Sequence, residues 1–213
     1  VLLGPNGSGK TSTVLGISGV VEPAFGEIWL DGQDLKGLDS DVIRRNGVAT
    51  VPEGHQVLQE LSVLENLLIA AGDLKGDPLQ QALIRVLEMF PELKALQNHP
   101  ARDLSGGQQQ MVAIAQALVV SPRFLVIDEL SFGLAPTVVT RLMPIIRRIA
   151  DEGIGVLLIE QFTQLALVLA DHVYVLSRGN ISYDGSPDKL RQDPDILHKA
   201  YFPVNDREAV GLI

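Results

Sequence analysis

The hydrophobic positions of this chain form short apolar runs that alternate with stripes at helical spacing. The runs at residues 1–3, 47–51, 124–127 and 156–159 predict strands buried on both faces. Apolar residues three and four apart within 64–68, 83–87 and 111–118 predict helices that bury one side. This pattern indicates an α/β domain with a mainly parallel sheet flanked by helices.

Local signals set several element boundaries. Ser62 and Glu65 form a capping-box pattern that predicts the start of a helix. A helix is expected over residues 136–150, with a kink at Pro144. Residues 173–183 predict a terminal hairpin, and a short helix follows from 186. Residues 25–36 predict an antiparallel edge region in which Trp29 is a packing residue.

A glycine-rich segment joins the first predicted strand to the first predicted helix. Glycines let the backbone turn its N–H groups inward around an anion, and the following helix adds its positive end. The lysine would reach the β- and γ-phosphates of a triphosphate, and the threonine hydroxyl would bind Mg²⁺. We therefore predict an ATP-binding loop formed by Gly4, Pro5, Asn6, Gly7, Ser8, Gly9, Lys10, Thr11 and Ser12.

Two adjacent carboxylates, Asp128 and Glu129, end the apolar run at 124–127. We expect Asp128 to hold Mg²⁺ together with Thr11. Glu129 would lie nearer the γ-phosphate and polarise the attacking water, with Lys10 stabilising the phosphate charge.

A third motif lies between these two, at Leu104 followed by Ser105, Gly106, Gly107 and Gln108. In this order the three motifs resemble those of ATP-binding cassette proteins. The resemblance implies that two such subunits pack head to tail, as a homodimer or a heterodimer. It also implies that Ser105 to Gln108 contact the ATP held by the other subunit.

Finer features resemble one subgroup, the second ATP-binding subunit of high-affinity branched-chain amino-acid importers. Glu53 stands where most cassettes have a glutamine that senses the γ-phosphate, Ala135 replaces an aspartate, and Gln161 replaces a histidine. Gln161 can bond the γ-phosphate or the water but carries no charge. Glu53 would repel phosphate unless it faces Mg²⁺ or a basic partner.

The resemblance also implies the organisation and the partners. We expect one ATPase domain over 1–213, with a helical subdomain at 56–110 inserted into a core of 1–55 and 111–213. In the family that subdomain touches membrane-spanning permease subunits, and Val57, Leu58 and Leu61 are either this docking surface or core. Cassettes normally begin with two further strands and an adenine-stacking aromatic residue, so we expect an N-terminally truncated chain.

Composition narrows the class of partner. A formal net charge of −9 argues against nucleic-acid binding, and the apolar runs are too short to span a bilayer. We expect a peripheral protein at the cytoplasmic face of the membrane. The 46% hydrophobic content suits a large core, and the absence of cysteine fits a reducing compartment.

Three alternatives stay open from the residues. The same motor could serve uptake of urea or short amides, because other subunits choose the substrate. A nucleotide-gated binding module with little hydrolysis would suit Gln161 and Ala135. A chromosome-maintenance ATPase shares the third motif, but the chain lacks the long heptad run that this class requires.

Overall fold

The computed structural model describes residues 1–201 of the 213, and a six-stranded sheet runs through their centre. In spatial order its strands are β4 (Val48–Val51), β5 (Phe124–Asp128), β6 (Gly155–Glu160), β1 (Leu2–Leu3), β7 (Val173–Ser177) and β8 (Asn180–Gly185). Neighbouring strands are parallel except β7 and β8, which form the predicted antiparallel hairpin. The predicted α/β class with a mainly parallel sheet is confirmed.

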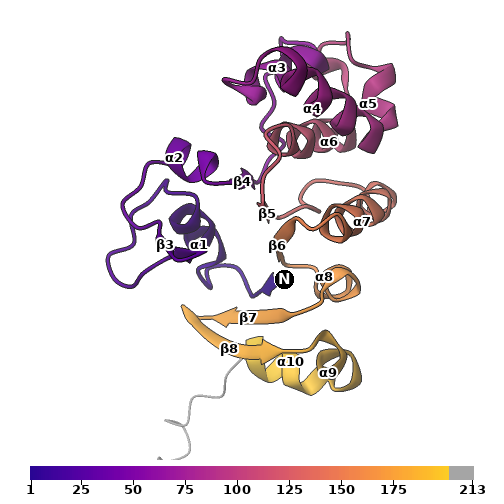
Figure 1. Cartoon of the computed structure of the whole chain (residues 1–213). Helices are drawn as coiled ribbons and strands as arrows, with labels where there is room; N and C mark the ends of the chain where they lie inside the picture. Colours follow the sequence, from indigo (N-terminus) through magenta and orange to yellow (C-terminus); the bar gives the residue numbers. More distant parts are fainter. Residues whose placement is uncertain (202–213) are drawn as a thin grey trace, which may run out of the picture.

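Helices cover both faces of this sheet and gather at its two ends. Figure 1 shows α1 on one side of the strands and α7 and α8 on the other, while α9 and α10 lie beyond β8. The described helices are α1 (Lys10–Ile17), α2 (Ser40–Arg45), α3 (Val63–Ala71), α4 (Gly76–Met89), α5 (Pro91–Ala95), a 3₁₀ helix (Ala101–Asp103), α6 (Gly106–Leu118), α7 (Pro136–Asp151), α8 (Thr163–Leu169), α9 (Pro187–Gln192) and α10 (Pro194–Tyr201).

The strands are apolar because both of their faces are buried. Leu125 and Ile127 of β5 pack into the cluster that contains α6 and α7, while Val126 between them faces the cluster that contains Val14 of α1. Successive side chains of a strand point to opposite faces, so an unbroken apolar run supplies both layers of core. This packing holds the carboxyl end of β5 firmly in place.

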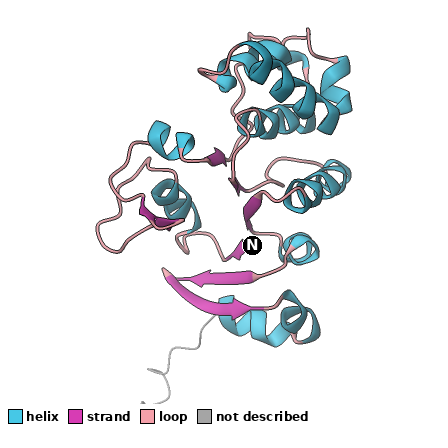
Figure 2. Ribbon diagram, in the orientation of Figure 1, coloured by secondary structure: helices cyan, strands magenta, loops and turns pink. Residues whose placement is uncertain are grey.

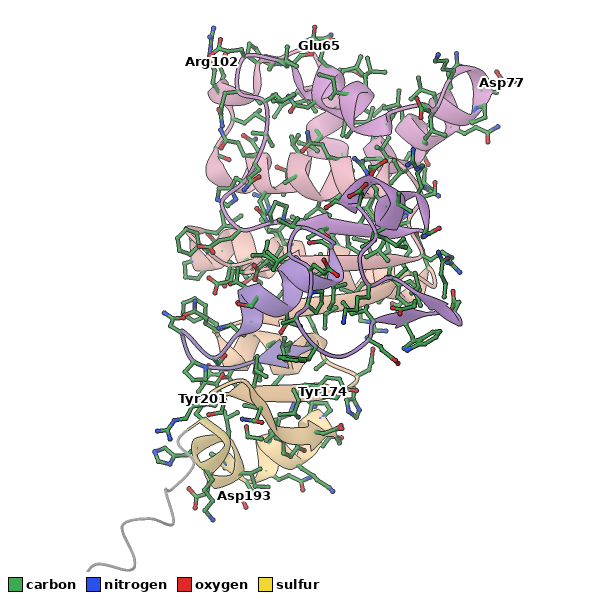
Figure 3. All side chains as sticks on the ribbon, turned by 90° about the vertical axis from the view of Figure 1, so that its left-hand side faces the viewer. Glu65, Asp77, Arg102, Tyr174, Asp193 and Tyr201 are labelled. Carbon is green, nitrogen blue, oxygen red and sulfur yellow. The ribbon has the colours of Figure 1, made fainter. Side chains whose placement is uncertain are left out.

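The helices α3, α4, α5 and α6 form one end of the molecule, and Figure 2 shows them grouped apart from most of the strands. Glu65, Asp77 and Arg102 mark this end in Figure 3, and Asp193 and Tyr201 mark the opposite one. The predicted capping box starts α3, because the Ser62 hydroxyl accepts from the Glu65 N–H and the Glu65 carboxylate accepts from the Ser62 N–H. The subdomain limits at 56 and 110 stay a prediction, and the second of them falls inside α6.

The antiparallel pairing expected within residues 25–36 is present, whereas the expectation that Trp29 is a packing residue was wrong. The antiparallel pair here, β2 (Trp29–Leu30) and β3 (Gln33–Asp34), forms a separate two-stranded sheet and not an edge of the main one. Trp29 is 60% exposed, and its indole N–H donates to the Glu27 carboxylate at 2.8 Å. Trp29 is exposed because the short two-stranded sheet that carries it offers little hydrophobic core against which the indole could pack. The antiparallel edge of the main sheet is β8.

No helix among residues 1–201 is both long enough and apolar enough to cross a membrane.

Candidate functional site

The glycine-rich loop turns from β1 into α1 and folds around the side chain of Lys10. The Lys10 ammonium is buried and donates to the carbonyl oxygens of Gly4, at 2.9 Å, and Pro5, at 3.3 Å. A Cβ at Gly4 would lie 2.3 Å from the Leu176 carbonyl oxygen, and Gly9 has a φ of 109°. Only glycine satisfies both positions, which explains the tight loop around the lysine.

Glu129 and Gln161 follow neighbouring strands and meet in space. Glu129 comes directly after β5 with a φ of 51°, and its N–H donates to the Ile159 carbonyl of β6 at 3.0 Å. The Gln161 amide donates to the Glu129 carboxylate at 2.5 Å. The carboxyl ends of parallel strands meet at one edge of the sheet, which is where open α/β sheets bind ligands.

The loop and these side chains enclose a cavity of about 420 Å³. Asp128 lies beside it, buried, and shares a neighbouring groove with Thr11 and Glu53. Gly4, Pro5 and Ser8 complete the loop without lining the cavity. Of the predicted site residues, the cavity is lined by Asn6, Gly7, Gly9, Lys10, Thr11, Ser12, Glu53, Glu129 and Gln161.

Two buried side-chain oxygens at this site have no hydrogen-bond partner: the Ser8 hydroxyl and Oδ1 of Asp128. Buried polar atoms are rarely left without a partner, so the Asp128 oxygen, which belongs to a residue lining the neighbouring groove, suits a bound ligand. In the described part of the chain, no three His, Cys, Asp or Glu side chains are placed to hold a metal by themselves. A Mg²⁺ held by one or two protein oxygens together with phosphate oxygens fits this arrangement.

The electrostatic environment of Asp128 favours the neutral acid when no ligand is bound. Burial is the largest cause, and together with the carboxylates of Glu129 and Glu53 it raises the pKa of Asp128 to about 6, against the opposing effect of the Lys10 ammonium. Three carboxylates therefore face one ammonium. A divalent cation would reverse this imbalance, since it favours the ionised form.

This pKa predicts a pH-dependent stability. A raised carboxyl pKa stabilises the folded protein fully below about pH 4, and the contribution is lost as the pH rises through about 6. Between about pH 4.5 and pH 8 the ligand-free wild type should lose about 2 kcal/mol that Asp128→Asn does not lose. Urea unfolding of both proteins at the two pH values, with chelator present, measures the difference. Parallel pH dependences in the two proteins would contradict the prediction.

Ser105 to Gln108 lie at the start of α6 and do not line the 420 Å³ cavity. The Ser105 hydroxyl accepts from the Gln108 N–H, and the Gln108 side chain accepts from the Ser105 N–H at 2.9 Å. Gly106 is exposed, whereas a Cβ at Gly107 would lie 2.3 Å from Val138 of α7. The Gln108 side chain therefore serves the helix cap. A role for this segment at another subunit's ATP stays a prediction.

Sequence reasoning missed several residues that join the site's loops. Glu160, at the end of β6, is buried and bonds Ser131 through two contacts. Phe132 lines the cavity although it is half exposed. His55 is half-buried, and its Nδ1 lies 2.5 Å from the side-chain oxygen of the buried Gln110. The pair Glu160 and Gln161 repeats the pattern of Asp128 and Glu129, polar residues ending an apolar strand, and this signal could have found Glu160.

Comparison with known proteins places the chain in a family. Residues 1–131 match the model of the ABC transporter family. The chain is 40% identical to the high-affinity branched-chain amino acid transport ATP-binding protein BraG of Pseudomonas aeruginosa, over 92% of this chain and 84% of that protein. It is 33% identical to the probable branched-chain amino acid transport ATP-binding protein LivF of Archaeoglobus fulgidus, over 89% and 80%. It is also 31% identical to the lipopolysaccharide export system ATP-binding protein LptB of Escherichia coli K12, over 92% and 82%.

Solved structures agree with this assignment. The ADP conformation of an ATP-binding cassette of an ABC transporter superimposes with a TM-score of 0.82 at 28% identity, covering 93% of this chain and 86% of that one. A dimeric bacterial ABC transporter cassette gives a TM-score of 0.76 at 25% identity, covering 87% and 84%. With the phosphate loop and the acids of β5 in place, the chain belongs to the ABC transporter family and is an ATP-binding ATPase of that family.

Proposed function

We propose that this ATPase powers uptake of branched-chain or related amino acids through partner membrane subunits, bound to them at the cytoplasmic face of the membrane. The observation that carries the proposal is the 40% identity to BraG over nearly the whole chain. Glu53, Ala135 and Gln161 support it, because they stand at the positions in which the importer subgroup departs from most cassettes.

At the site, ATP would bind with its phosphates along the loop. The Lys10 ammonium would leave the Gly4 and Pro5 carbonyls for the β- and γ-phosphate oxygens, and N–H groups at the start of α1 would face the same anion. Thr11 and Asp128 would hold Mg²⁺, which neutralises phosphate charge when bound. Glu53, at the edge of the same cavity, would face the Mg²⁺ side.

Glu129 would then act as the base toward the attacking water. Its carboxylate lines the same cavity as Lys10, and Gln161 holds one of its oxygens at 2.5 Å. The second oxygen stays free to orient a water in line with the γ-phosphate. Gln161 stays neutral throughout, so its contribution is orientation rather than charge.

A second cassette would complete each site. Ser105 and Gly106 are exposed at the N-terminus of α6, where the free N–H groups and helix dipole suit an anion. Because this segment does not line its own chain's phosphate cavity, contact with the partner's ATP is the arrangement that uses it. The partner would be a second copy or a related subunit.

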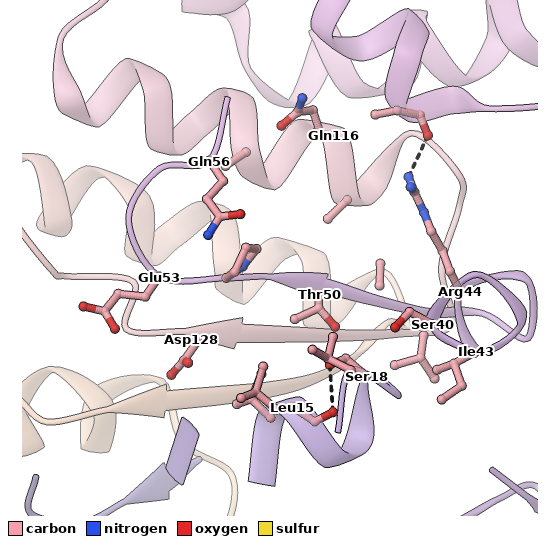
Figure 4. Close-up of a pocket in the computed structure, with 18 of the residues that line it drawn as sticks. Leu15, Ser18, Ser40, Ile43, Arg44, Thr50, Glu53, Gln56, Gln116 and Asp128 are labelled. Carbon is pink, nitrogen blue, oxygen red and sulfur yellow. Dashed lines mark hydrogen bonds between the residues drawn. The ribbon is translucent and has the colours of Figure 1, made fainter. Parts of the chain in front are cut away.

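A groove of about 840 Å³ would provide the surface for the membrane partner. It lies between α1, α2, β4, α3 and α6, and Figure 4 shows Ile43 and Gln116 on different sides of it. Its apolar lining includes Ile43, Ala113 and Ala117. Polar groups surround it, among them Arg44, which donates to the Ala70 carbonyl at 2.6 Å. An apolar groove with a polar rim suits an amphipathic helix. Val57, Leu58 and Leu61 do not line this groove.

The groove also reaches the nucleotide site. Glu53 and Asp128 lie at the same end of it in Figure 4, and Thr11 and Glu53 line both the groove and the phosphate cavity. A helix docked here would contact the segment that carries Glu53. Permease movement and ATP binding could then be coupled through Glu53.

The test is substrate uptake in the organism of origin with the gene deleted, then restored as wild type or Glu129→Gln. We expect radiolabelled leucine uptake to fall on deletion and to return with the wild type only. Uptake of urea or a short amide that follows the same pattern, with leucine unaffected, would support the related motor for those substrates. A defect in lipopolysaccharide export with normal leucine uptake would overturn the import assignment and favour the relationship to LptB.

A further inference from the structure

A fully buried carboxylate lies directly behind the catalytic edge of the sheet. Glu160 is the last residue of β6 and is 1% exposed, and Gln161 follows it. Glutamate is rarely buried to this degree unless every acceptor position is used. Its neighbours therefore show what the side chain does.

Ser131 donates a hydrogen bond to each oxygen of this carboxylate. The Ser131 N–H donates to one oxygen at 3.0 Å, and the Ser131 hydroxyl donates to the other at 2.8 Å. Burial raises the pKa of Glu160, and hydrogen bonding from Ser131 and from the backbone of Gln161 and Phe162 opposes that rise. A donor on each oxygen suits a side chain that accepts at both of them. A glutamine at position 160 would place its side-chain NH2 group, which is a donor, against the donors of Ser131.

These bonds join the two loops that carry Glu129 and Gln161. The β5–β6 ladder ends with Asp128 opposite Ile159, and its last backbone bond runs from the Glu129 N–H to the Ile159 carbonyl at 3.0 Å. Beyond that bond no strand pairing joins the two loops. Glu129 and Gln161 meet on the cavity side. Ser131, two residues after Glu129, meets Glu160 on the buried side. The two contacts lie back to back across the same pair of loops.

We propose that Glu160 is a positioning residue for ATP hydrolysis, whose clamp on Ser131 holds the Glu129 loop where Gln161 can orient the Glu129 carboxylate. The inference rests on the proposed roles of Glu129 and Gln161. Glu160 lies behind the reacting groups and acts through Gln161 and the Glu129 loop. Displacement of a reacting group by about 1 Å can cost about 100-fold in rate, so a modest shift of these loops should be measurable.

The experiment measures kcat and KM for MgATP hydrolysis, together with the Kd of a fluorescent ATP analogue, for the full chain. Glu160→Gln should lower kcat about 10-fold or more while Kd changes less than about 2-fold. Ser131→Ala removes the hydroxyl donor, keeps the N–H donor and should lower kcat in the same direction by a smaller factor. If Glu160→Gln does not fold, as judged by circular dichroism, Ser131→Ala carries the test.

A matched control exists in α3. Glu65 accepts from both the N–H and the hydroxyl of Ser62, the same pair of donors that Ser131 offers to Glu160, but far from the cavity. Glu65→Gln should leave kcat within about 2-fold of the wild type. If the kcat of Glu160→Gln also stays within about 2-fold of the wild type, the proposal is overturned. The same criterion applies to Ser131→Ala where that variant is used in its place.

A second comparison separates positioning from general weakening of the fold. In a Gln161→Ala background, Glu160→Gln should lower kcat by less than about 2-fold further, because the residue it acts through is gone. If Glu160→Gln lowers kcat by the same factor in the Gln161→Ala background as in the wild type, the proposal is overturned. The same comparison applies to Ser131→Ala. Absence of hydrolysis by the wild type would instead refute the proposed motor function, so the two failures are distinguishable.

Discussion

Replacing Glu129 with glutamine is expected to lower kcat for ATP hydrolysis by about 10²- to 10⁴-fold. The amide keeps the oxygen that accepts from Gln161 at 2.5 Å, so the geometry of the pair is retained while the basic group is lost. ATP binding should therefore persist. Phosphate release measures the rate, and light scattering should show an ATP-bound dimer accumulating in the variant.

Glu152→Gln is the control, because Glu152 is an exposed acid paired with Arg148 at the end of α7. It should hydrolyse ATP as the wild type does. Equal hydrolysis by the wild type and Glu129→Gln would show that Glu129 is not the working base. If both bind ATP and neither hydrolyses it, the nucleotide-gated binding module becomes the better description of the isolated chain.

Replacing Lys10 with alanine is expected to weaken ATP binding by about 30-fold or more. Removing one partner of a buried charged contact costs about 2 to 5 kcal/mol. Lys10 is the buried cation of the phosphate cavity, and its ammonium already lies inside the loop. Titration with a fluorescent ATP analogue measures the loss, and kcat/KM should fall at least in parallel.

Lys94→Ala, in α5, removes a lysine far from the loop and should bind ATP normally. Lys10→Arg tests shape at constant charge. The planar guanidinium is larger than an ammonium and should restore only part of the affinity. Unchanged ATP affinity in Lys10→Ala would mean that phosphate does not bind in this loop.

The local sequence signals predicted the elements of the fold well. The strand at 48–51, the hairpin at 173–185 and the helix from Pro136 to Asp151 follow from apolar runs, turn residues and a proline at a helix start. The capping box of Ser62 and Glu65 was confirmed because it is a contact between residues three apart. The prediction that Trp29 is a packing residue was wrong, because residue type alone does not say whether a hydrophobic core lies beside the side chain.

Some parts of the candidate site could be predicted from the sequence, and others could not. The loop from Gly4 to Ser12 could be predicted whole, because a single continuous segment makes the phosphate cradle. The acids after β5 could be predicted because they end a buried strand. That Glu129 contacts Gln161, 32 residues away, could only be anticipated from the resemblance. The Glu160–Ser131 and His55–Gln110 contacts carried no local signal and were missed.

By itself, then, the sequence determined the helices, the strands, the phosphate loop and the family, because each depends on residues close together in the chain. Only the tertiary structure decided which strand ends meet, that Glu160 bonds Ser131, and that Glu53 lies between the groove and the phosphate cavity. Strand order is set by packing of both sheet faces against the helices. A hydrogen bond across two strand ends exists only after that order is fixed.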